Sequence, residues 1–142
     1  MAMRLHIIAR GKIGRSPESE LVNRYLKRIS WPTKHSELPD KGGELPASDF
    51  PYKTIILDEK GAQLSSVELA RLLERWRDDG VREVRFLIGA ADGFDDIARA
   101  GADQLIAFGK ATWPHLMARA MLAEQLFRAT SIIANHPYHR EG

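Results

Sequence analysis

Cysteine is absent from this sequence of 142 residues, and so is any long apolar run. Without cysteine the chain forms neither disulfide bonds nor thiolate metal sites, which is compatible with the reducing cytoplasm. No apolar stretch approaches the length of a membrane span, so a membrane protein is not expected. The first ten residues alternate and carry charge, which argues against a secretory signal peptide. We therefore expect a cytoplasmic globular protein.

Aromatic residues make up only 8% of the chain, whereas hydrophobic residues make up 44% and charged residues 28%. These proportions are typical of a globular protein. A chain of 142 residues is long enough to bury one core of ordinary size. We find no internal repeat or low-complexity tract, so residues 1–142 are predicted to form a single domain.

The small net charge of +2 hides an uneven distribution. Residues 1–35 hold eight basic side chains and two acidic ones, whereas residues 36–100 hold nine basic and fourteen acidic ones. A basic segment beside an acidic one is typical of a surface that binds a polyanion on one side. A solvated helix face without a partner would give the same pattern, so charge alone leaves both interpretations open.

Short apolar stretches alternate with amphipathic ones along the chain. Two of the amphipathic stretches carry clear helix start signals, Ser16–Pro17 and the capping box Ser65-x-x-Glu68. The alternation predicts an α/β fold with a mainly parallel sheet covered on both faces. The predicted strands are 3–9, 33–38, 53–58, 83–88 and 103–108, the predicted helices are 16–29, 65–80, 95–100 and 115–129, and 39–51 is predicted as a loop.

The last predicted helix is apolar nearly all the way round its axis. One face can pack on the sheet, and the opposite face then needs another cover. In a chain of this size a second copy of the same chain is the simplest cover, so a homodimer is expected.

The segment from Leu105 to Pro114, which leads into this helix, is the first candidate binding element. Its apolar run ends at Phe108, and Gly109 then accepts backbone angles that other residues resist. Such a loop can present bare backbone amides and carbonyls to a small flat ligand.

Two further strand ends are expected at the same edge of the sheet. Leu57 lies at the end of the third strand, and Gly89 follows the fourth strand within Ile88–Gly93. That turn is neither a dinucleotide fingerprint nor a Walker loop, and a plain strand-to-helix turn is its simplest interpretation. Open α/β sheets bind ligands beyond the carboxyl ends of their strands. Leu57, Gly89 and Gly109 are therefore predicted to form one adenosine site.

The chain ends in a dense group of polar and aromatic side chains at residues 135–140. His136-x-x-His139 has the spacing of a metal site, but the chain has no cysteine and few nearby carboxylates, so no metal is predicted. A frayed terminus is the other simple interpretation. Glu124 and Arg128 are four residues apart on the last predicted helix, which is typical of a helical ion pair. Arg128 could equally point toward the tail.

Four segments together resemble one known family: Phe86–Gly89, Thr112–His115, Ala123–Ala129 and Asn135–Glu141. The resemblance is to the bacterial ribosomal RNA large-subunit methyltransferase H family, SPOUT-class enzymes that methylate N3 of a pseudouridine in 23S rRNA. It runs the whole length of the chain in element order, and the terminal Asn-His-Pro-Tyr-His-Arg-Glu string is its most specific part. The chain departs from the family at residues 39–51, where a longer basic insertion is common, so RNA contacts of that insertion are not carried over.

The resemblance implies a SPOUT-type sheet flanked by helices, with a C-terminal trefoil knot that general rules of chain topology would not predict. It implies S-adenosyl-L-methionine as the cofactor, held by the backbone of the knot. It also implies a homodimer in which the tail of one subunit completes a site with its partner, and 23S rRNA within the ribosome as the substrate. The cofactor-binding positions would be Leu57, Gly89, Gly109, Lys110, Ala111, Thr112, Trp113 and Pro114.

Within this resemblance the candidate catalytic residues are Arg128, Tyr138, His139 and Arg140. The N3 nitrogen of the base carries a proton and is a poor nucleophile, so the site must help to remove that proton. His139 is the candidate base, because imidazole titrates near neutral pH. Arg128 and Arg140 are candidates to stabilise charge on the flanking carbonyl oxygens and to hold phosphate. Tyr138 could stack on the base.

Two other functions are compatible with parts of the sequence. A non-catalytic RNA- or ribosome-binding domain of the same fold would keep every element and need not bind the cofactor. A nucleotide-dependent or metal-dependent hydrolase would need a phosphate-binding loop or a carboxylate cluster, and we find neither in the sequence.

Overall fold

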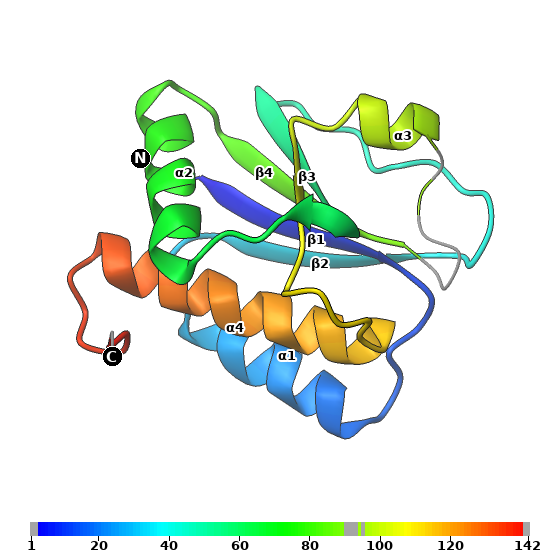
Figure 1. The fold of residues 1–142 in the computed structure, drawn as a ribbon, viewed down its shortest axis with the longest axis horizontal. Coiled ribbons are helices and arrows are strands. Elements are labelled where there is room, and N and C mark those ends of the chain that lie inside the picture. Colours follow the sequence, from blue (N-terminus) through cyan, green and yellow to red (C-terminus); the bar gives the residue numbers. More distant parts are fainter. Residues whose placement is uncertain (1–2, 90–93, 95, 141–142) are drawn as a thin grey trace.

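The computed structural model describes residues 3–89, 94 and 96–140, and Figure 1 shows their arrangement. Strands and helices alternate along the chain, as the sequence predicts. The proposed turn at Ile88–Gly93 falls largely outside the described residues. The elements in chain order are β1 (Arg4–Arg10), α1 (Pro17–Arg28), β2 (Thr33–Leu38), β3 (Tyr52–Ala62), α2 (Ser66–Asp78), β4 (Glu83–Ile88), α3 (Asp96–Ala100), β5 (Gln104–Ile106) and α4 (His115–Ile133).

The strands form one sheet in the order β2-β1-β4-β3-β5, and each neighbouring pair is parallel. All residues of the central strand β4 are buried, which explains why its sequence is apolar at most positions. Because parallel strands point the same way, their carboxyl ends meet at one edge of the sheet. The segments after β3, β4 and β5 are therefore brought together there.

The two faces of the sheet are covered unequally. The main core lies on one face, where Ile7, Phe86 and neighbouring strand residues pack against α1, α2 and α4. On the other face Ile8, Ile56 and Leu87 form a smaller cluster, packed against residues that flank α3 and end β2. The prediction that both faces are covered is confirmed, although the three longer helices share one face (Figure 1).

Both helix start signals in the sequence form as predicted. The side chain of Ser16 accepts a hydrogen bond from the backbone N–H of Ser19, and Pro17 is the first residue of α1. Ser65 and Glu68 form the complete reciprocal capping box of α2. These local hydrogen bonds satisfy backbone donors that have no partner inside the helix.

Helix α4 is longer than predicted and reaches Ile133. Thr130 is buried in this extension, and its hydroxyl is satisfied by donating to the backbone oxygens of Leu126 and Phe127. Trp113, just before the helix, and Met117 in its first turns remain about two-fifths exposed. Among the described residues, no helix is long and apolar enough to cross a membrane.

Strand β3 runs five residues past its pairing with β4 and β5 near Leu57 and then meets the end of β5 a second time. Its register shifts between Leu57 and Ala62, and Ala62 again pairs with Ile106. The backbone N–H of Ala107 donates to the oxygen of Ala62 at 2.9 Å. At Gly61 the two segments of the chain pass so closely that an added Cβ atom would lie 2.6 Å from the backbone N and C of Ile106. The trefoil knot expected in this region stays a prediction.

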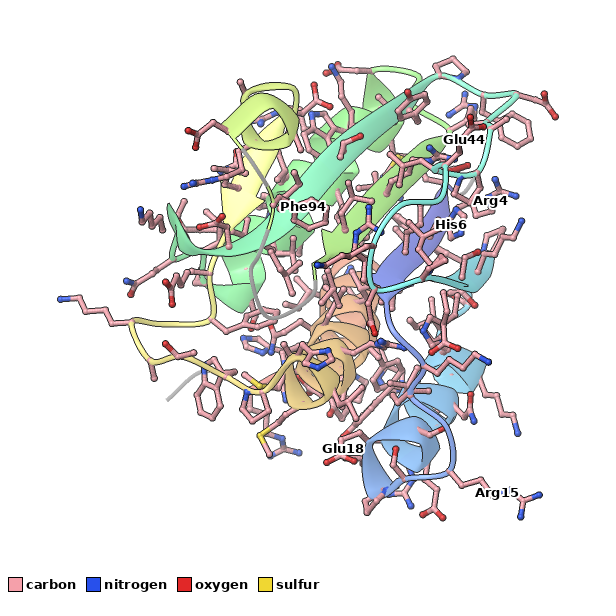
Figure 2. The ribbon with its side chains drawn as sticks, turned by 90° about the vertical axis from the view of Figure 1, so that its right-hand side faces the viewer. Arg4, His6, Arg15, Glu18, Glu44 and Phe94 are labelled. Carbon is pink, nitrogen blue, oxygen red and sulfur yellow. The ribbon has the colours of Figure 1, made fainter. Side chains whose placement is uncertain are left out.

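A buried polar group lies at the amino ends of β1 and β4. Glu83 is fully buried and accepts hydrogen bonds from Arg4, from Arg85 at 2.9 Å and from Ser48 at 3.1 Å. Arg85 also donates to the backbone oxygen of Pro46. The short 39–51 segment is thus tied to the sheet, and Figure 2 shows its residue Glu44 on the same side as Arg4 and His6.

Replacing Gly61 with Ala tests the close crossing. The added methyl group would overlap the main chain of Ile106, which has no flexible side-chain end to move away. We expect Gly61→Ala to lower the free energy of unfolding by about 1–3 kcal/mol, the usual cost of overpacking. Gly14→Ala is the control, because its Cβ would meet nothing within 4 Å and only its backbone angle is strained, at about 1 kcal/mol. Urea titration measures both, and a Gly61→Ala loss no larger than that of the control would contradict the crossing.

Acid unfolding tests the Glu83 group. Burial alone would raise the pKa of Glu83, but hydrogen bonds from Arg85, Arg4 and His6 outweigh it and lower the pKa to about 2. The folded state therefore gains stability from the Glu83 carboxylate above its ordinary pKa, and loses it as the pH falls toward 2.

We expect Glu83→Gln to cost about 3–5 kcal/mol at neutral pH, because Arg4 and Arg85 lose their anionic partner. Its free energy of unfolding should also fall less than that of the wild type between about pH 5 and pH 3. Denaturant titrations across this range, with the exposed Glu44→Gln as control, measure both effects. Parallel pH curves for wild type and Glu83→Gln would count against this account.

Candidate functional site

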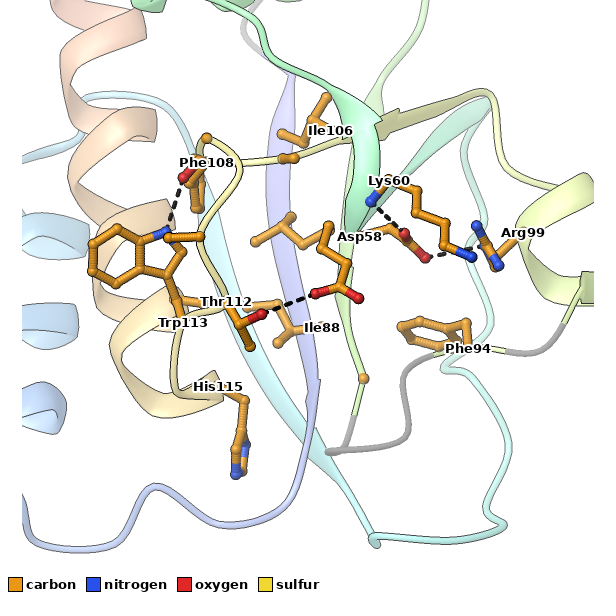
Figure 3. A pocket seen from close by; sticks show the side chains of 17 residues that line it. Asp58, Lys60, Ile88, Phe94, Arg99, Ile106, Phe108, Thr112, Trp113 and His115 are labelled. Carbon is orange, nitrogen blue, oxygen red and sulfur yellow. Dashed lines mark hydrogen bonds and ion pairs between the residues drawn. The ribbon is translucent and has the colours of Figure 1, made fainter.

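A cavity of about 340 Å³ opens at the carboxyl edge of the sheet, and Figure 3 shows its side chains. It lies between the ends of β3 and β4, the loop after β5 and the first turn of α4. This is the edge at which open α/β sheets bind ligands. Its described lining residues are Leu57, Asp58, Glu59, Lys60, Ile88, Gly89, Phe94, Arg99, Ile106, Ala107, Phe108, Gly109, Ala111, Thr112, Trp113, His115 and Ala118.

The cavity combines apolar surface with fixed polar groups. Ile88, Phe94 and Ile106 contribute apolar side chains. Asp58 forms an ion pair with Arg99 at 3.0 Å and also accepts a hydrogen bond from the backbone N–H of Lys60 at 2.8 Å. Figure 3 shows Asp58, Lys60 and Arg99 grouped on the same side of the cavity as Phe94. Apolar walls with a few oriented polar groups suit a flat heterocycle with polar edges.

The loop from Phe108 to Trp113 is held in shape by two side-chain hydrogen bonds. Thr112 Oγ1 donates to Glu59 Oε2 at 3.1 Å, which joins the loop to β3. Trp113 Nε1 donates to the backbone oxygen of Phe108 at 2.8 Å, which closes the loop on itself (Figure 3). Gly109 has a φ of 84°, in the left-handed region that favours glycine. The backbone of the loop is thereby kept along the cavity.

A second cavity of about 510 Å³ lies on the other side of the same loop. The two cavities share Ile106–Gly109, so the main chain after β5 forms a wall between them. The second cavity is also lined by the residues that lead into α2, by Met121, and by Glu124 and Gln125 of α4.

The tail packs against α1 and α4, which answers the question of whether it is frayed. Arg128 Nη1 lies 3.1 Å from Nδ1 of His139. Tyr138 donates its hydroxyl hydrogen to Glu124 Oε2 at 2.7 Å, and Glu124 also accepts from Arg128 at 2.7 Å. The structure therefore brings together three of the four predicted catalytic residues, Arg128, Tyr138 and His139, while Arg140 is exposed.

The ring of Tyr138 is already in contact with side chains of its own subunit. It meets Phe127 edge-on with ring centroids 4.5 Å apart, and the guanidinium groups of Arg128 and Arg28 lie 4.7 and 5.6 Å from its centroid. Burial and hydrogen bonds with Glu124 and Tyr25 raise the pKa of Tyr138 well above its ordinary value. Tyr138 therefore stays protonated and acts as a hydrogen-bond donor to Glu124.

The two tail histidines have contacts that differ from those of metal ligands. The backbone N–H of Tyr138 donates to Nδ1 of His136 at 3.2 Å, and Nδ1 of His139 faces the Arg128 cation. A permanent positive charge beside a ring nitrogen disfavours a bound cation there. In the described part of the chain, no group of three or more His, Cys, Asp or Glu side chains could hold a metal ion.

Comparisons with known proteins agree with this architecture. A family described as "Predicted SPOUT methyltransferase" matches residues 3–139. The chain belongs to the SPOUT methyltransferase family. It is 71% identical to a protein called "Ribosomal RNA large subunit methyltransferase H" from Sphingopyxis alaskensis, over 99% of each chain. It is 69% identical to a protein of the same name from Rhizorhabdus wittichii, over 99% of this chain and 100% of that one.

A solved structure shares the SPOUT fold. It is titled "The structure of a probable methylase family protein from Haemophilus influenzae Rd KW20", with a TM-score of 0.62, 11% sequence identity, and coverage of 98% of this chain and 70% of that one. At this identity the likeness concerns the fold. The five-stranded parallel sheet flanked by helices is thus the SPOUT fold that the sequence resemblance implied.

In this SPOUT methyltransferase, most of the predicted cofactor positions line the first cavity. Lys110 and Pro114 do not appear in the lining: Lys110 is exposed within the loop, and Pro114 is the residue that precedes α4. The predicted positions that line the cavity are Leu57, Gly89, Gly109, Ala111, Thr112 and Trp113.

Several side chains at the cavity and the tail were missed by sequence reasoning. Asp58 and Arg99 come from separate elements, and their charges carry no signal of pairing. Tyr25 and Arg28 of α1 both contact the tail, and neither was predicted to do so. The +6 charge excess of residues 1–35 could have pointed to Arg28, although not to its aromatic contacts.

Replacing Thr112 with Val tests how the loop is held. The substitution keeps the side-chain shape but removes the hydroxyl that donates to Glu59. We expect faster amide hydrogen exchange in residues 108–113, with a loss of global stability of about 1 kcal/mol or less for one exposed hydrogen bond. Hydrogen-exchange mass spectrometry measures the loop directly, and Glu59→Gln should have a similar but weaker effect. Unchanged exchange in Thr112→Val would show that the bond does not hold the loop.

Proposed function

We propose that this SPOUT methyltransferase uses S-adenosyl-L-methionine to methylate N3 of a pseudouridine in 23S rRNA. The relatives named as large-subunit ribosomal RNA methyltransferases support rRNA as the substrate class. The position of the methyl group and the nature of the base rest on the resemblance of the terminal tail. The observation that carries the proposal is the cavity between the ends of β3 and β4 and the loop after β5, lined by six of the positions expected to bind the cofactor.

The residues of this cavity fit S-adenosyl-L-methionine. Ile88, Phe94 and Ile106 offer apolar surface to an adenine ring, and the backbone around Gly109 offers hydrogen-bonding groups to its edge. Asp58 and Arg99 supply groups of both signs for the ribose hydroxyls and the charged amino-acid end. When bound, this cofactor supplies a methyl group that leaves its sulfur, which keeps the bonding electron pair, and forms a bond to N3.

The first turn of α4, which lines the first cavity, lies far from the tail of the same subunit. His115 lines the cavity at the start of α4, whereas Arg128 lies thirteen residues later on the same helix. At a rise of about 1.5 Å per residue, the two are about 20 Å apart along the helix. The tail in Figure 1 lies at the opposite end of α4 from the loop after β5. We therefore propose a homodimer in which the tail of one subunit faces the cofactor cavity of its partner.

Three partly exposed apolar side chains on α1, on α4 and just before α4 are compatible with the homodimer. Leu21, Trp113 and Met117 are 37%, 42% and 41% exposed. Apolar side chains like these become buried when another chain packs on them. A second copy would bury the exposed side of α4, whose sequence is apolar nearly all the way round.

His139 would accept the N3 proton through Nδ1. In the free subunit Arg128 Nη1 points at this atom, and because a guanidinium only donates, the ring proton of His139 lies on Nε2. When the base enters, its N3–H would replace Arg128 Nη1 as the donor to Nδ1 of His139. Arg128 Nη1, held beside Nδ1, would then donate to the carbonyl oxygen next to N3, on which negative charge develops as the proton leaves. We assign Tyr138 to anchoring the tail, since its ring already packs on Phe127 and two arginines.

The assembled ribosome in the cytoplasm is the proposed substrate. Helix α1 carries three exposed basic residues, Arg24, Lys27 and Arg28, and Arg28 contacts Tyr138 of the tail. These side chains can contact phosphate. A small protein makes few such contacts, so a preformed RNA surface favours binding more than free RNA does.

Methyl transfer to ribosomes tests the function. Ribosomes from cells that lack this gene, incubated with the protein and labelled S-adenosyl-L-methionine, should gain a methyl group on a pseudouridine of 23S rRNA. Mass spectrometry of digested nucleosides identifies the modified position. Titration calorimetry with S-adenosylhomocysteine separates this proposal from a non-catalytic RNA-binding domain, which need not bind the cofactor product. The absence of both S-adenosylhomocysteine binding and methyl transfer would overturn the proposal.

Mixed dimers test the shared site. Gly109→Val strains the loop at a φ of 84° and should disable the cavity, whereas His139→Ala should disable the tail. Each variant alone should be inactive. After denaturation and refolding together, dimers with one of each keep one intact site, so activity should recover to about a quarter of the wild type. No recovery, with mixed dimers shown by mass spectrometry, would mean that each site forms within one subunit.

A further inference from the structure

The carboxylate of Glu124 is the common hydrogen-bond acceptor of the tail cluster, which consists of Glu124, Arg128, Tyr138 and His139. It accepts hydrogen bonds from Arg128 Nη2 at 2.7 Å and Nε at 3.1 Å, from Tyr138 Oη at 2.7 Å and from Gln125 Nε2 at 2.8 Å. Its side chain is 19% exposed. Burial alone would raise the pKa of Glu124, but hydrogen bonds from Arg128 and Tyr138 outweigh it and keep the pKa below its ordinary value.

These contacts exceed those of an ordinary helical ion pair. An exposed i, i+4 pair contributes only a few tenths of a kcal/mol and leaves both side chains free to move. Here Glu124 also receives a donor from Tyr138, fourteen residues further along the chain in the tail. Gln125 in turn accepts from Ser66 at the start of α2 at 2.7 Å, so the group is tied to a second helix.

Glu124 binds one edge of the Arg128 guanidinium and leaves the other edge to face the tail. The Nε and Nη2 edge is bound to Glu124, and Nη1 points at Nδ1 of His139. Because a guanidinium is planar and rigid, fixing one edge fixes the direction of the other. Glu124 therefore determines where the free edge of Arg128 points.

Glu124 also fixes the course of the tail. Its bond to the Tyr138 hydroxyl, together with the packing of that ring on Phe127, anchors the residue directly before His139. A one-residue separation leaves the imidazole little freedom relative to the anchor. Two candidate catalytic groups, Arg128 and His139, thus depend on the same carboxylate.

We propose that Glu124 is a positioning residue for methyl transfer, which holds the free edge of Arg128 and the imidazole of His139 toward the target base. This rests on the proposed function. Glu124 touches neither the base nor the cofactor in this account and acts through Arg128 and Tyr138. Sequence reasoning assigned it only to a helical ion pair, because the Tyr138 contact joins distant parts of the chain.

Glu124→Gln is the most informative substitution. The side chain keeps its size but loses its charge, and its amide N–H₂ would face the donors of Arg128 and Tyr138. We expect kcat to fall by about 10- to 100-fold, the range that misplacement of catalytic groups produces. The calorimetric Kd for S-adenosylhomocysteine and the KM for S-adenosyl-L-methionine should change less than about twofold, because Glu124 does not line the first cavity.

Glu74→Gln is the matched control. Glu74 is also a helical glutamate paired with arginines, Arg71 at 2.9 Å and Arg77 at 3.9 Å, but on α2 and away from the tail. It should leave kcat and tail dynamics unchanged. Thermal unfolding of both variants shows whether a fall in kcat reflects unfolded protein.

A double-mutant cycle separates positioning from a merely structural role. If Glu124 acts through Arg128, the variant Glu124→Gln with Arg128→Lys should be little slower than Arg128→Lys alone. A structural role predicts that the losses multiply. Wild-type kcat in Glu124→Gln, fully multiplied losses, or an equal loss of cofactor affinity would each overturn the proposal.

Hydrogen exchange of residues 135–140 tests the anchor independently of activity. Exchange should be faster in Glu124→Gln than in the wild type and unchanged in Glu74→Gln. If the wild type methylates no ribosomal pseudouridine, the proposed function fails, and faster exchange would then leave Glu124 as an anchor without a role in methyl transfer. Unchanged exchange would refute the anchor itself, whatever the activity.

Discussion

The passage of Gly61 against the main chain of Ile106 is the constraint on which the remaining structure depends. At this crossing a Cβ atom would lie 2.6 Å from backbone atoms, so only glycine lets the end of β3 reach the end of β5. The crossing sets the position of Ile106–Gly109, and this short run of main chain forms the wall shared by both cavities. Ligand-binding backbone of this kind needs support from packed neighbours, since a loop alone would pay a large entropic cost for the same shape.

Helix α4 connects the two functional ends of each subunit. Its first turn borders the proposed cofactor cavity, and its middle and later turns carry Glu124 and Arg128 beside the tail. A helix of this length is too stiff to bring its own ends together. The proposed dimer resolves the separation, because two-fold symmetry can place the end of one helix beside the start of the other. The apolar surface around Met117 would then serve both assembly and catalysis.

Local features were predictable where the signal lay within a few residues. The serine cap of α1, the capping box of α2 and the buried strand β4 form as the sequence predicts. Thr112 and Trp113, which the resemblance implies as cofactor-binding residues, line the first cavity, and their binding role stays a prediction. Gly61, the ion pair of Asp58 with Arg99 and the buried Glu83 group were missed, because each depends on contact between segments far apart in the sequence.

By itself the sequence determined the α/β class, most element boundaries and the family, since periodicity, capping residues and the terminal motif are properties of neighbouring residues. Only the tertiary structure decided which side chains meet. It placed Tyr138 between α1 and α4 and gave Glu124 its second partner. It also put the tail and the cavity at opposite ends of one helix. The physical reason is that packing joins residues by position in space, and a linear pattern records only their position along the chain.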